Sequence, residues 1–244
     1  MFQNILKLFN KNHEKNNHYL IDIHSHLIPG IDDGVKTLEE SLTLIRKMES
    51  LGFEKLITTP HIMKHRFPNT SDIIKKGFES VQEAIIKQNI NIELEYASEY
   101  FFDEHFLELI RKKDILTFGD NYVLFELPYS PHKNTTPPIG LENTIFELQS
   151  AGYRPVLAHP ERYNYFSTRI DKLLKLKENA LLFQMNVNSF GGFYGKTAQK
   201  SAQILLNEGV IDFVGSDMHN YKYLDCFEKT IFDKNFNKLF KNNR

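Results

Sequence analysis

The sequence has almost no cysteine, no excess of charge of either sign and no long hydrophobic run, and each absence excludes a class of protein. The single cysteine, Cys226, excludes an internal disulfide framework and is typical of a reducing compartment. The 30 Lys and Arg residues balance 31 Asp and Glu residues, so no net field directs the protein to nucleic acid or to an anionic membrane. No apolar run approaches the roughly 18 residues that a membrane-spanning helix needs, and the N-terminus lacks the long apolar region of a signal peptide. These observations predict a cytoplasmic protein with a small or local ligand.

The length of 244 residues fits one large domain, because single α/β barrels routinely reach this size. A chain of this length buries roughly 70–75% of its unfolded surface, so a sizeable core is available. The first 18 residues form a separate pattern, in which four apolar residues recur at helical spacing before a polar linker: Phe2, Ile5, Leu6 and Phe9. We expect an amphipathic appendage over residues 1–18 and one domain over residues 19–244. The appendage either docks on the barrel, another subunit or a partner, or is a loosely held terminus.

Strands and helices alternate along the expected domain. Seven runs have the composition of strands: one that starts at Tyr19, and residues 55–61, 92–99, 122–126, 154–159, 181–187 and 210–219. Helical patterns separate them, including residues 38–51 after a Thr37 capping box, a helix capped by Ser71, and residues 141–148, 170–176 and 197–206. The interval of roughly 30 residues is that of βα units, so the alternation predicts an α/β barrel with parallel strands.

Side chains that bind metals follow these strands. His24 and His26 come at the end of the first strand, and their i, i+2 spacing lets both imidazoles reach one ion. The turn residues of 29–34 then force a tight, acidic loop over the same end. Taken alone, this stretch also fits two surface histidines beside an acidic turn.

The remaining strands supply more ligands at matching positions, and a parallel barrel gathers its strand C-termini on one face. That face collects nine metal-type side chains: His24, His26, Asp33, His61, Glu99, Glu126, His159, Asp217 and His219. Buried charges of this kind would repel one another without a cation. The whole set therefore predicts a metal site at the mouth of the barrel rather than a solvated acidic turn.

With these residues placed, the chain resembles the PHP family, named for polymerase and histidinol phosphatase. Within it, the chain is most similar to the bacterial manganese-dependent protein tyrosine phosphatases of the CapC/CpsB capsule type. The resemblance extends from about Tyr19 to Leu224 through Asp-Ile-His-Ser-His, Ile-Asp-Asp-Gly, Thr-Pro-His, Ser-Glu-Tyr, Phe-Glu-Leu, Ala-His-Pro-Glu-Arg and Gly-Ser-Asp-Met-His. It implies a distorted (β/α)7 TIM-like barrel, the PHP fold, that hydrolyses protein phosphotyrosine.

The resemblance also implies a cluster of three metal ions. Its first ion would bind His24, His26, Glu99 and Asp217, with Glu99 bridging to a second ion on Glu126 and His159. The third ion would bind Asp33, His61 and His219, with Asp32 as the less favoured neighbour of Asp33. Arg162 matches the phosphate-binding arginine of the family, and Asp217 would lie close to the attacking water.

Imidazole and carboxylate ligands together suit manganese, iron or zinc. The proportion of carboxylates among the ligands and the family resemblance both favour manganese. Metal ions would neutralise the phosphate oxygens and activate water, so hydrolysis would be direct. Neither Cys226 nor any serine stands in a recognisable nucleophile motif, which argues against a phosphocysteine route.

One feature departs from the family pattern. The family often has a second arginine shortly after the Ser-Asp-Met-His-Asn motif, whereas here the next arginine is Arg244. Lys222 is the favoured substitute for phosphate binding, and Arg66 or Lys64 is the alternative.

The expected substrate is a phosphotyrosine protein, and the resemblance suggests the tyrosine-rich tail of a bacterial kinase that controls capsule or exopolysaccharide production. A histidinol-phosphate phosphatase would share the fold and the metals. A non-catalytic PHP module of a larger assembly is the third reading, against which the complete ligand set argues.

Overall fold

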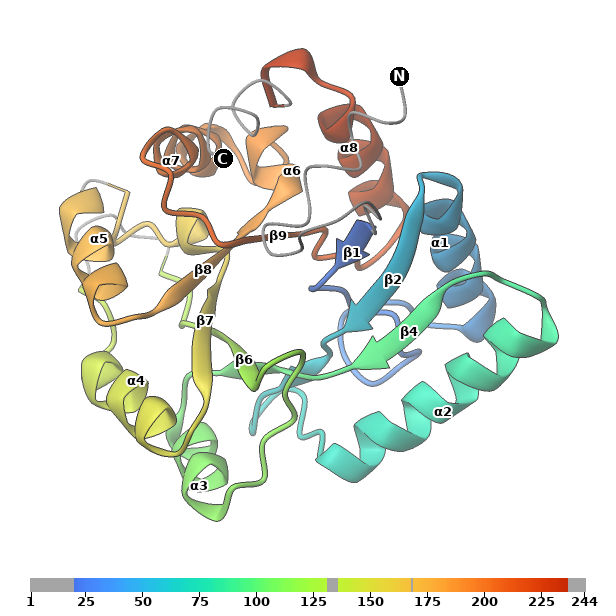
Figure 1. Ribbon diagram of the computed structural model, residues 1–244, viewed down its shortest axis with the longest axis horizontal. Helices are drawn as coiled ribbons and strands as arrows, with labels where there is room; N and C mark the ends of the chain where they lie inside the picture. The colour runs from blue at the N-terminus through green and yellow to red at the C-terminus, as the bar shows by residue number, and fades with distance from the viewer. Residues whose placement is uncertain (1–19, 131–135, 168, 237–244) are drawn as a thin grey trace.

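The computed structural model describes residues 20–130, 136–167 and 169–236, so the expected appendage over residues 1–18 lies outside the described residues. All strand pairs are parallel and form two sheets, of order β1-β2-β4 and β3-β5-β6-β7-β8-β9. The strands are β1 (Leu20–Asp22), β2 (Phe53–Thr58), β3 (His61–Ile62), β4 (Glu93–Tyr96), β5 (Glu99–Phe101), β6 (Tyr122–Glu126), β7 (Arg154–Ala158), β8 (Leu182–Asn186) and β9 (Phe213–Gly215). Figure 1 shows them around a common centre, with the helices outside. The predicted α/β fold is confirmed.

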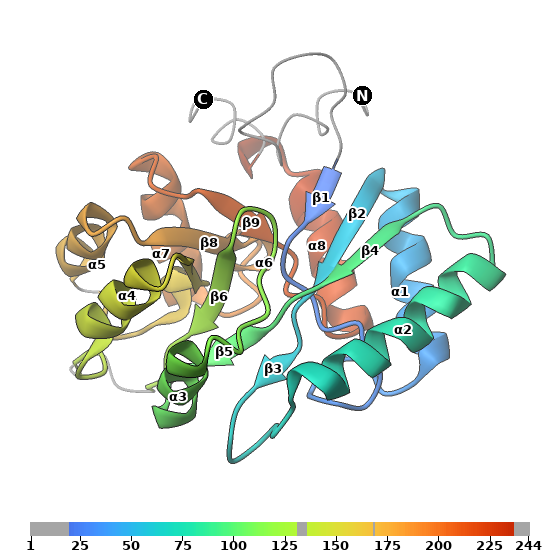
Figure 2. The ribbon, with the colours of Figure 1, turned by 60° about the horizontal axis from the view of Figure 1, so that its bottom comes forward.

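Two of the seven predicted strands are interrupted. The run over 55–61 breaks between β2 and β3, and the run over 92–99 breaks between β4 and β5 (Figure 2). Pro60 explains the first break, because proline has no N–H for a sheet ladder. The Pro60 carbonyl instead accepts a hydrogen bond from Ser98 Oγ at 2.8 Å, which ties the two breaks together. Counted as interrupted strands, β2–β3 and β4–β5 bring the total to the seven that the sequence predicts.

The ends of the ring meet beside the first histidines. Asp217 N–H donates to the His24 carbonyl at 2.8 Å, and His26 N–H donates to the Met218 carbonyl at 2.8 Å. Ser25 and Met218 form a parallel bridge between the same segments. These bonds join the chain after β9 to the chain after β1.

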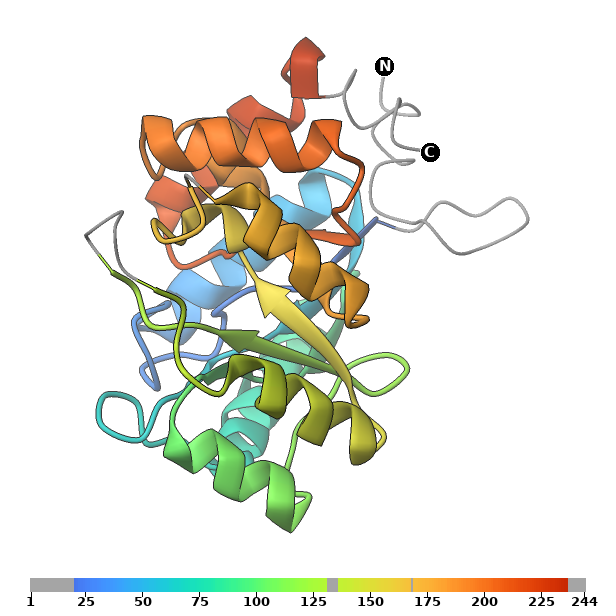
Figure 3. The same cartoon turned by 90° about the vertical axis from the view of Figure 1, so that its left-hand side faces the viewer.

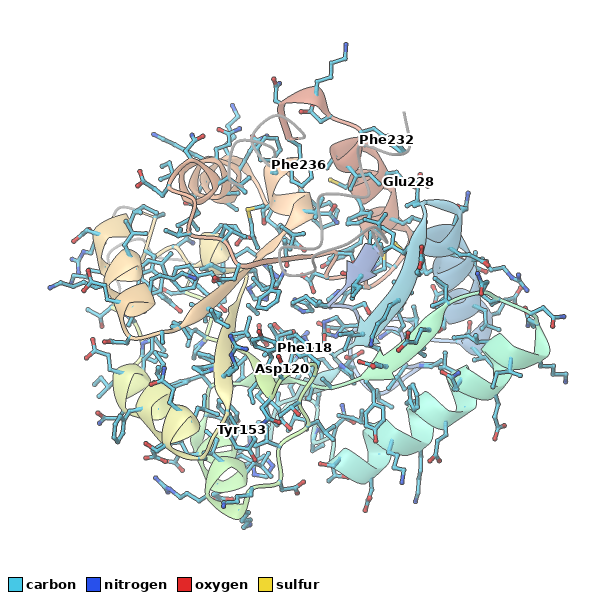
Figure 4. The ribbon with its side chains drawn as sticks, viewed as in Figure 1. Phe118, Asp120, Tyr153, Glu228, Phe232 and Phe236 are labelled. Carbon is cyan, nitrogen blue, oxygen red and sulfur yellow. The ribbon has the colours of Figure 1, made fainter. Side chains whose placement is uncertain are left out.

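Apolar side chains fill the ring and also the layer outside it. The inner cluster comprises Ile23, Ile57, Ala97, Phe118, Leu124, Val156 and Ala158. Phe118 lies near the centre of the ring in Figure 4, and its ring packs 5.4 Å from that of Tyr122 and 6.2 Å from that of Phe213. A larger cluster fills the space between strands and helices. Polar side chains also lie toward the amino ends of the strands, where Lys55 of β2 pairs with Glu93 and Glu95 of β4.

The helices pack outside the strands, as Figure 3 shows from the side. They are α1 (Leu38–Ser50), α2 (Ser71–Lys87), α3 (Glu104–Lys112), α4 (Leu141–Ser150), α5 (Ile170–Glu178), α6 (Val187–Phe190), α7 (Lys196–Asn207) and α8 (Tyr221–Ile231), with the 3-10 turn η2 (Pro160–Arg162). None of the described helices is long and apolar enough to cross a lipid bilayer.

Helix caps are partly as predicted. Thr37 caps α1 by accepting the Glu40 N–H, but the Glu40 carboxylate accepts the Lys36 N–H, so only half of the predicted capping box forms. The cap of α2 is Thr70 rather than Ser71, because the Thr70 hydroxyl accepts the Ile73 N–H. Each such cap is typically worth about 1 kcal/mol, and either residue type provides it.

Candidate metal centre

The nine predicted metal-type side chains come together at the carboxyl ends of the strands. They come from the segments after β1, β7 and β9, from the last residue of β6, and from the starts of β3 and β5. The prediction that His61 and Glu99 end their strands is wrong: each follows a break and opens a new segment, where the two residues pair directly in register. The breaks turn both side chains toward the common centre.

A first group of four buried side chains meets at the junction of β1 and β9. His24, His26, Glu99 and Asp217 each offer a ligand atom within 4.8 Å of the others. His24 Nε2 lies 3.2 Å from Glu99 Oε2 and 3.3 Å from Asp217 Oδ1. This is the set that the family resemblance assigns to the first ion.

A second group lies toward the acidic loop and comprises His26, Asp33, His61 and His219. Asp33 Oδ1 is 3.4 Å from His61 Nε2 and 3.6 Å from His219 Nε2, and the rings of His26 and His219 stack at 4.0 Å. It contains the three residues assigned to the third ion.

A third group comprises His61, Glu99 and Glu126. His61 Nδ1 lies 3.3 Å from an oxygen of each carboxylate, so the ring has one nitrogen toward this group and the other toward Asp33. His159, which the sequence assigns here, has Nε2 at 3.0 Å from Glu99 Oε1 and 3.9 Å from Glu126 Oε2. Glu99 therefore contacts both of the first two predicted sites.

Asp32 lies behind the cluster, and Asp33 faces it. Asp32 Oδ2 is 2.8 Å from His26 Nδ1 and accepts the His61 N–H, while Oδ1 accepts the Gly34 N–H. Burial opposes ionisation, but the charge and hydrogen bond of His26 lower the Asp32 pKa to about 2. A carboxylate on the far nitrogen of a histidine fixes its orientation and raises its basicity as a ligand.

Tight packing holds the acidic loop in place. A Cβ on Gly34 would lie 2.3 Å from the His26 carbonyl oxygen and 2.5 Å from His26 Cβ. Only glycine therefore allows the loop to approach the second histidine this closely.

The donor set fits metal ions. Asp33 Oδ1 and His61 Nδ1 are buried and make no hydrogen bond with any of the described residues. Burial, and then the charge of Glu99, raise the pKa of Glu126 to about 7, as expected where two carboxylates share a site. Uncompensated acceptors of this kind beside imidazoles are what transition-metal ions bind.

Arg162 lies directly beside the first group. Arg162 Nη1 donates to Asp217 Oδ2 at 3.0 Å, and the guanidinium lies over the Tyr194 ring at 4.2 Å. The arginine ends η2, which begins after His159, a residue with left-handed backbone geometry at φ 36°. The unusual turn places a metal-type ligand and a phosphate-type donor side by side.

The structure places the two candidates for the second phosphate-binding basic residue differently. Lys222 lies exposed in the first turn of α8, where its backbone N–H donates to the Asn220 side chain. Arg66 also lies on the surface, but its Nη2 is 3.4 Å from Asp33 Oδ2 and its guanidinium lies 4.8 Å from the Phe67 ring centre. Arg66 therefore contacts the cluster.

The sequence reasoning missed three polar side chains that contact the cluster. Gln184 and Asn186 are uncharged amides within the predicted strand over 181–187, and Tyr194 stands in no charged or histidine motif, so residue type did not indicate any of the three. All three form hydrogen bonds with predicted ligands or with one another.

Comparison with known proteins identifies a family for this chain. Residues 20–225 match the family described as capsular polysaccharide synthesis, CpsB/CapC. The chain belongs to the CpsB/CapC family. Among CpsB/CapC relatives, tyrosine-protein phosphatase CpsB of Streptococcus agalactiae is 31% identical, over 82% of this chain and 83% of the relative. Tyrosine-protein phosphatase YwqE of Bacillus subtilis is 28% identical, over 83% of this chain and 78% of the relative.

A solved structure agrees with the CpsB/CapC assignment. It is one of the crystal structures of YwqE from Bacillus subtilis and CpsB from Streptococcus pneumoniae, which are described as unique metal-dependent tyrosine phosphatases. The match has a TM-score of 0.79 and 26% identity, and covers 91% of this chain and 90% of the other. The resemblance to CapC/CpsB phosphatases that the sequence motifs indicate is confirmed.

Proposed function

We propose that this chain is a metal-dependent protein tyrosine phosphatase. The convergence of three potential metal-binding groups and a half-buried arginine at one barrel face carries the proposal. The CpsB/CapC relatives named tyrosine-protein phosphatases support it. Capsular polysaccharide synthesis is the process with which the family is associated.

We assign the metal-holding role to the nine clustered side chains and propose three ions, with manganese as the favoured metal and iron or zinc as alternatives. The mixture of imidazole and carboxylate supports this choice. Bound ions would neutralise the phosphate oxygens and lower the pKa of a water molecule. The hydrogen bond from Arg162 orients the Asp217 carboxylate, and Glu99 belongs to both the first and the third group.

Arg162 would bind the phosphoryl group. Its guanidinium is held between the Asp217 carboxylate and the Tyr194 ring, and its planar donors match phosphate oxygens in pairs. Cys226 offers no competing nucleophile, because burial raises its thiol pKa and its Sγ lies 3.9 Å from the Thr230 hydroxyl.

We further propose that the substrate is the phosphorylated tyrosine-rich tail of a bacterial tyrosine kinase, and that the protein acts in the cytoplasm. The association of the family with capsular polysaccharide synthesis supports such a partner. The near absence of cysteine supports a reducing compartment.

A side-by-side assay tests the proposed function. The purified protein, loaded with manganese, is given a phosphotyrosine peptide and histidinol phosphate at equal concentrations, and phosphate release is measured. We expect the peptide to have the higher kcat/KM. A preference for histidinol phosphate would favour that alternative enzyme, and no release from either would favour a non-catalytic module.

Arg162→Lys should reduce kcat/KM for a phosphotyrosine peptide by about 10²–10³, or roughly 3–4 kcal/mol, because a lysine cannot donate in pairs from a plane. Metal content, measured by elemental analysis, should stay at the wild-type value. Arg154→Lys is the matched control. The Arg154 guanidinium also lies over a tyrosine ring, that of Tyr122 at 4.3 Å, but Arg154 is at the start of β7 rather than at the carboxyl end where the cluster lies. An unimpaired Arg162→Lys variant would show that Arg162 does not bind phosphate.

Arg66→Ala and Lys222→Ala, measured together, identify the second basic residue. The contact with Asp33 leads us to expect that Arg66→Ala loses about tenfold or more in kcat/KM, roughly 1.4 kcal/mol, while Lys222→Ala does not. The opposite result would support Lys222, as the sequence favours. Two unimpaired variants would mean that Arg162 and the metals bind phosphate without a second basic side chain.

A further inference from the structure

Two buried amides on β8 connect two of the proposed metal ligands. Gln184 Oε1 lies 2.8 Å from His24 Nδ1, and Gln184 Nε2 donates to Asn186 Oδ1 at 3.0 Å. Asn186 Nδ2 then donates to Asp217 Oδ2 at 2.7 Å. Gln184 and Asn186, here called the amide pair, lie on the same face of β8 because residues i and i+2 of a strand share a face. Their hydrogen bonds form a continuous chain from His24 to Asp217.

The Asp217 end of this chain sets the direction of every bond. Asp217 Oδ2 also accepts from Arg162 Nη1 at 3.0 Å and from Tyr194 Oη at 2.8 Å, so it acts only as an acceptor. The nitrogen of the Asn186 amide must therefore face Asp217, and its oxygen must face Gln184. By the same logic the Gln184 nitrogen faces Asn186, and its oxygen faces His24.

This orientation dictates the tautomer of His24. An acceptor oxygen beside Nδ1 requires that Nδ1 carries the proton, so Nε2 keeps its lone pair. Nε2 is the atom that lies 3.2 Å from Glu99 and 3.3 Å from Asp217 Oδ1 within the first group. At the other end, three donors occupy Asp217 Oδ2 and leave Oδ1 toward His24 and His26.

The packing around the amide pair leaves no room for a looser arrangement. Gln184, Asn186, His24 and Asp217 are all at most 1% exposed. A Cβ added to Gly215 would lie 2.9 Å from Gln184 Nε2 and 2.7 Å from His24 Cβ, so glycine is required there for close approach. Amides in this position orient both ligands without adding a charge to a cluster that already holds four carboxylates.

We propose that Gln184 and Asn186 are positioning residues of the metal centre, which together present His24 Nε2 and Asp217 Oδ1 to the same ion. The inference rests on the proposed metal-dependent function, because it assigns the first group to an ion. The amide pair acts through these ligands and touches neither substrate nor ion.

Manganese affinity of the full-length protein, measured without substrate, tests this role. Gln184→Met removes both bonds of Gln184 at nearly constant volume, and Asn186→Leu removes the side-chain bonds of Asn186 to Gln184, Asp217 and Tyr194. Each should weaken manganese binding at one site by about 10–100-fold, the range typical of residues that orient a metal ligand, while the remaining ions bind as in the wild type. Asn188→Leu is the matched control, since Asn188 is also a buried amide near the end of β8, but its side chain donates to the Tyr223 carbonyl.

The double variant separates this role from simple packing. If the amide pair works as one chain, Gln184→Met with Asn186→Leu should lose no more affinity than the worse single variant. Unchanged affinity in both single variants, or a double variant whose loss is the sum of the two, would overturn the proposal. Should Gln184→Met fail to fold, Gln184→Asn keeps an amide but is one methylene too short to reach both partners, and the same loss is expected.

A wild-type protein that binds manganese but does not hydrolyse phosphotyrosine peptides would overturn the proposed function alone. Weaker metal binding in the variants would still support the role of the amide pair. The two proposals therefore fail separately.

Discussion

Asp217→Asn should nearly abolish phosphotyrosine hydrolysis. An asparagine side chain has one acceptor oxygen and one NH₂ group, whereas both oxygens of Asp217 are in use. Its Oδ2 accepts from Arg162, Asn186 and Tyr194, and its Oδ1 lies among the histidines of the first group. In one orientation the NH₂ group would face the three donors, and the hydrogen bond from Arg162 would be lost. In the other orientation it would face the proposed ion, and a metal ligand would be lost.

Kinetics on a phosphotyrosine peptide, with metal content measured on the same sample, provide the measurement. Even changes to residues behind metal ligands cost about 10–100-fold, so a directly facing carboxylate should cost at least as much. A variant that keeps more than about a tenth of the wild-type rate would contradict the assignment. Asp22→Asn is the control, because Asp22 is equally buried but its carboxylate accepts from the backbone and hydroxyl of Ser216 rather than from Arg162, Asn186 and Tyr194. It should keep the metal content of the wild type.

Removing the metal ions should have an effect of similar size. A chelator should abolish phosphate release, because the ions that the cluster would bind would supply the activated water as well as positive charge. Adding manganese should restore the activity best, with iron or zinc less effective, because the cluster supplies four carboxylates beside its imidazoles. Equal recovery with magnesium would argue against the histidine-rich groups as the binding site, because magnesium prefers oxygen ligands.

Much of the site could be predicted because its residue types stand in local patterns. His24 and His26 follow β1 two residues apart, Glu126 is the last residue of β6, and His159 comes directly after β7. Parallel strands then bring such positions together without further information. The same patterns predict the seven strand positions and five of the described helices, but not α3, α6 or α8.

The partition of the cluster could not be predicted from local patterns. His61 contacts two groups, through its two nitrogens, because Pro60 interrupts the strand and Glu99 pairs with it in register. Asp32 and Asp33 are adjacent in sequence, and only the loop geometry decides which one faces the histidines and which one orients His26. Neither preference follows from residue type.

Long-range contacts account for the rest. Gln184 meets His24 across 160 residues of sequence, and Asn186 meets Asp217 from the neighbouring strand, so no spacing rule links them. His159 and Asp217 both have positive φ angles, of 36° and 51°, which their side chains do not favour. Such backbone geometry is imposed by the surrounding barrel.

The most direct test of the central claim is a manganese titration of metal-depleted protein, with bound metal per chain and phosphotyrosine hydrolysis measured on the same samples. The three groups at the barrel mouth predict no hydrolysis without metal and full activity only when two or three ions are bound per chain. Full activity with less than one ion bound per chain would contradict the account.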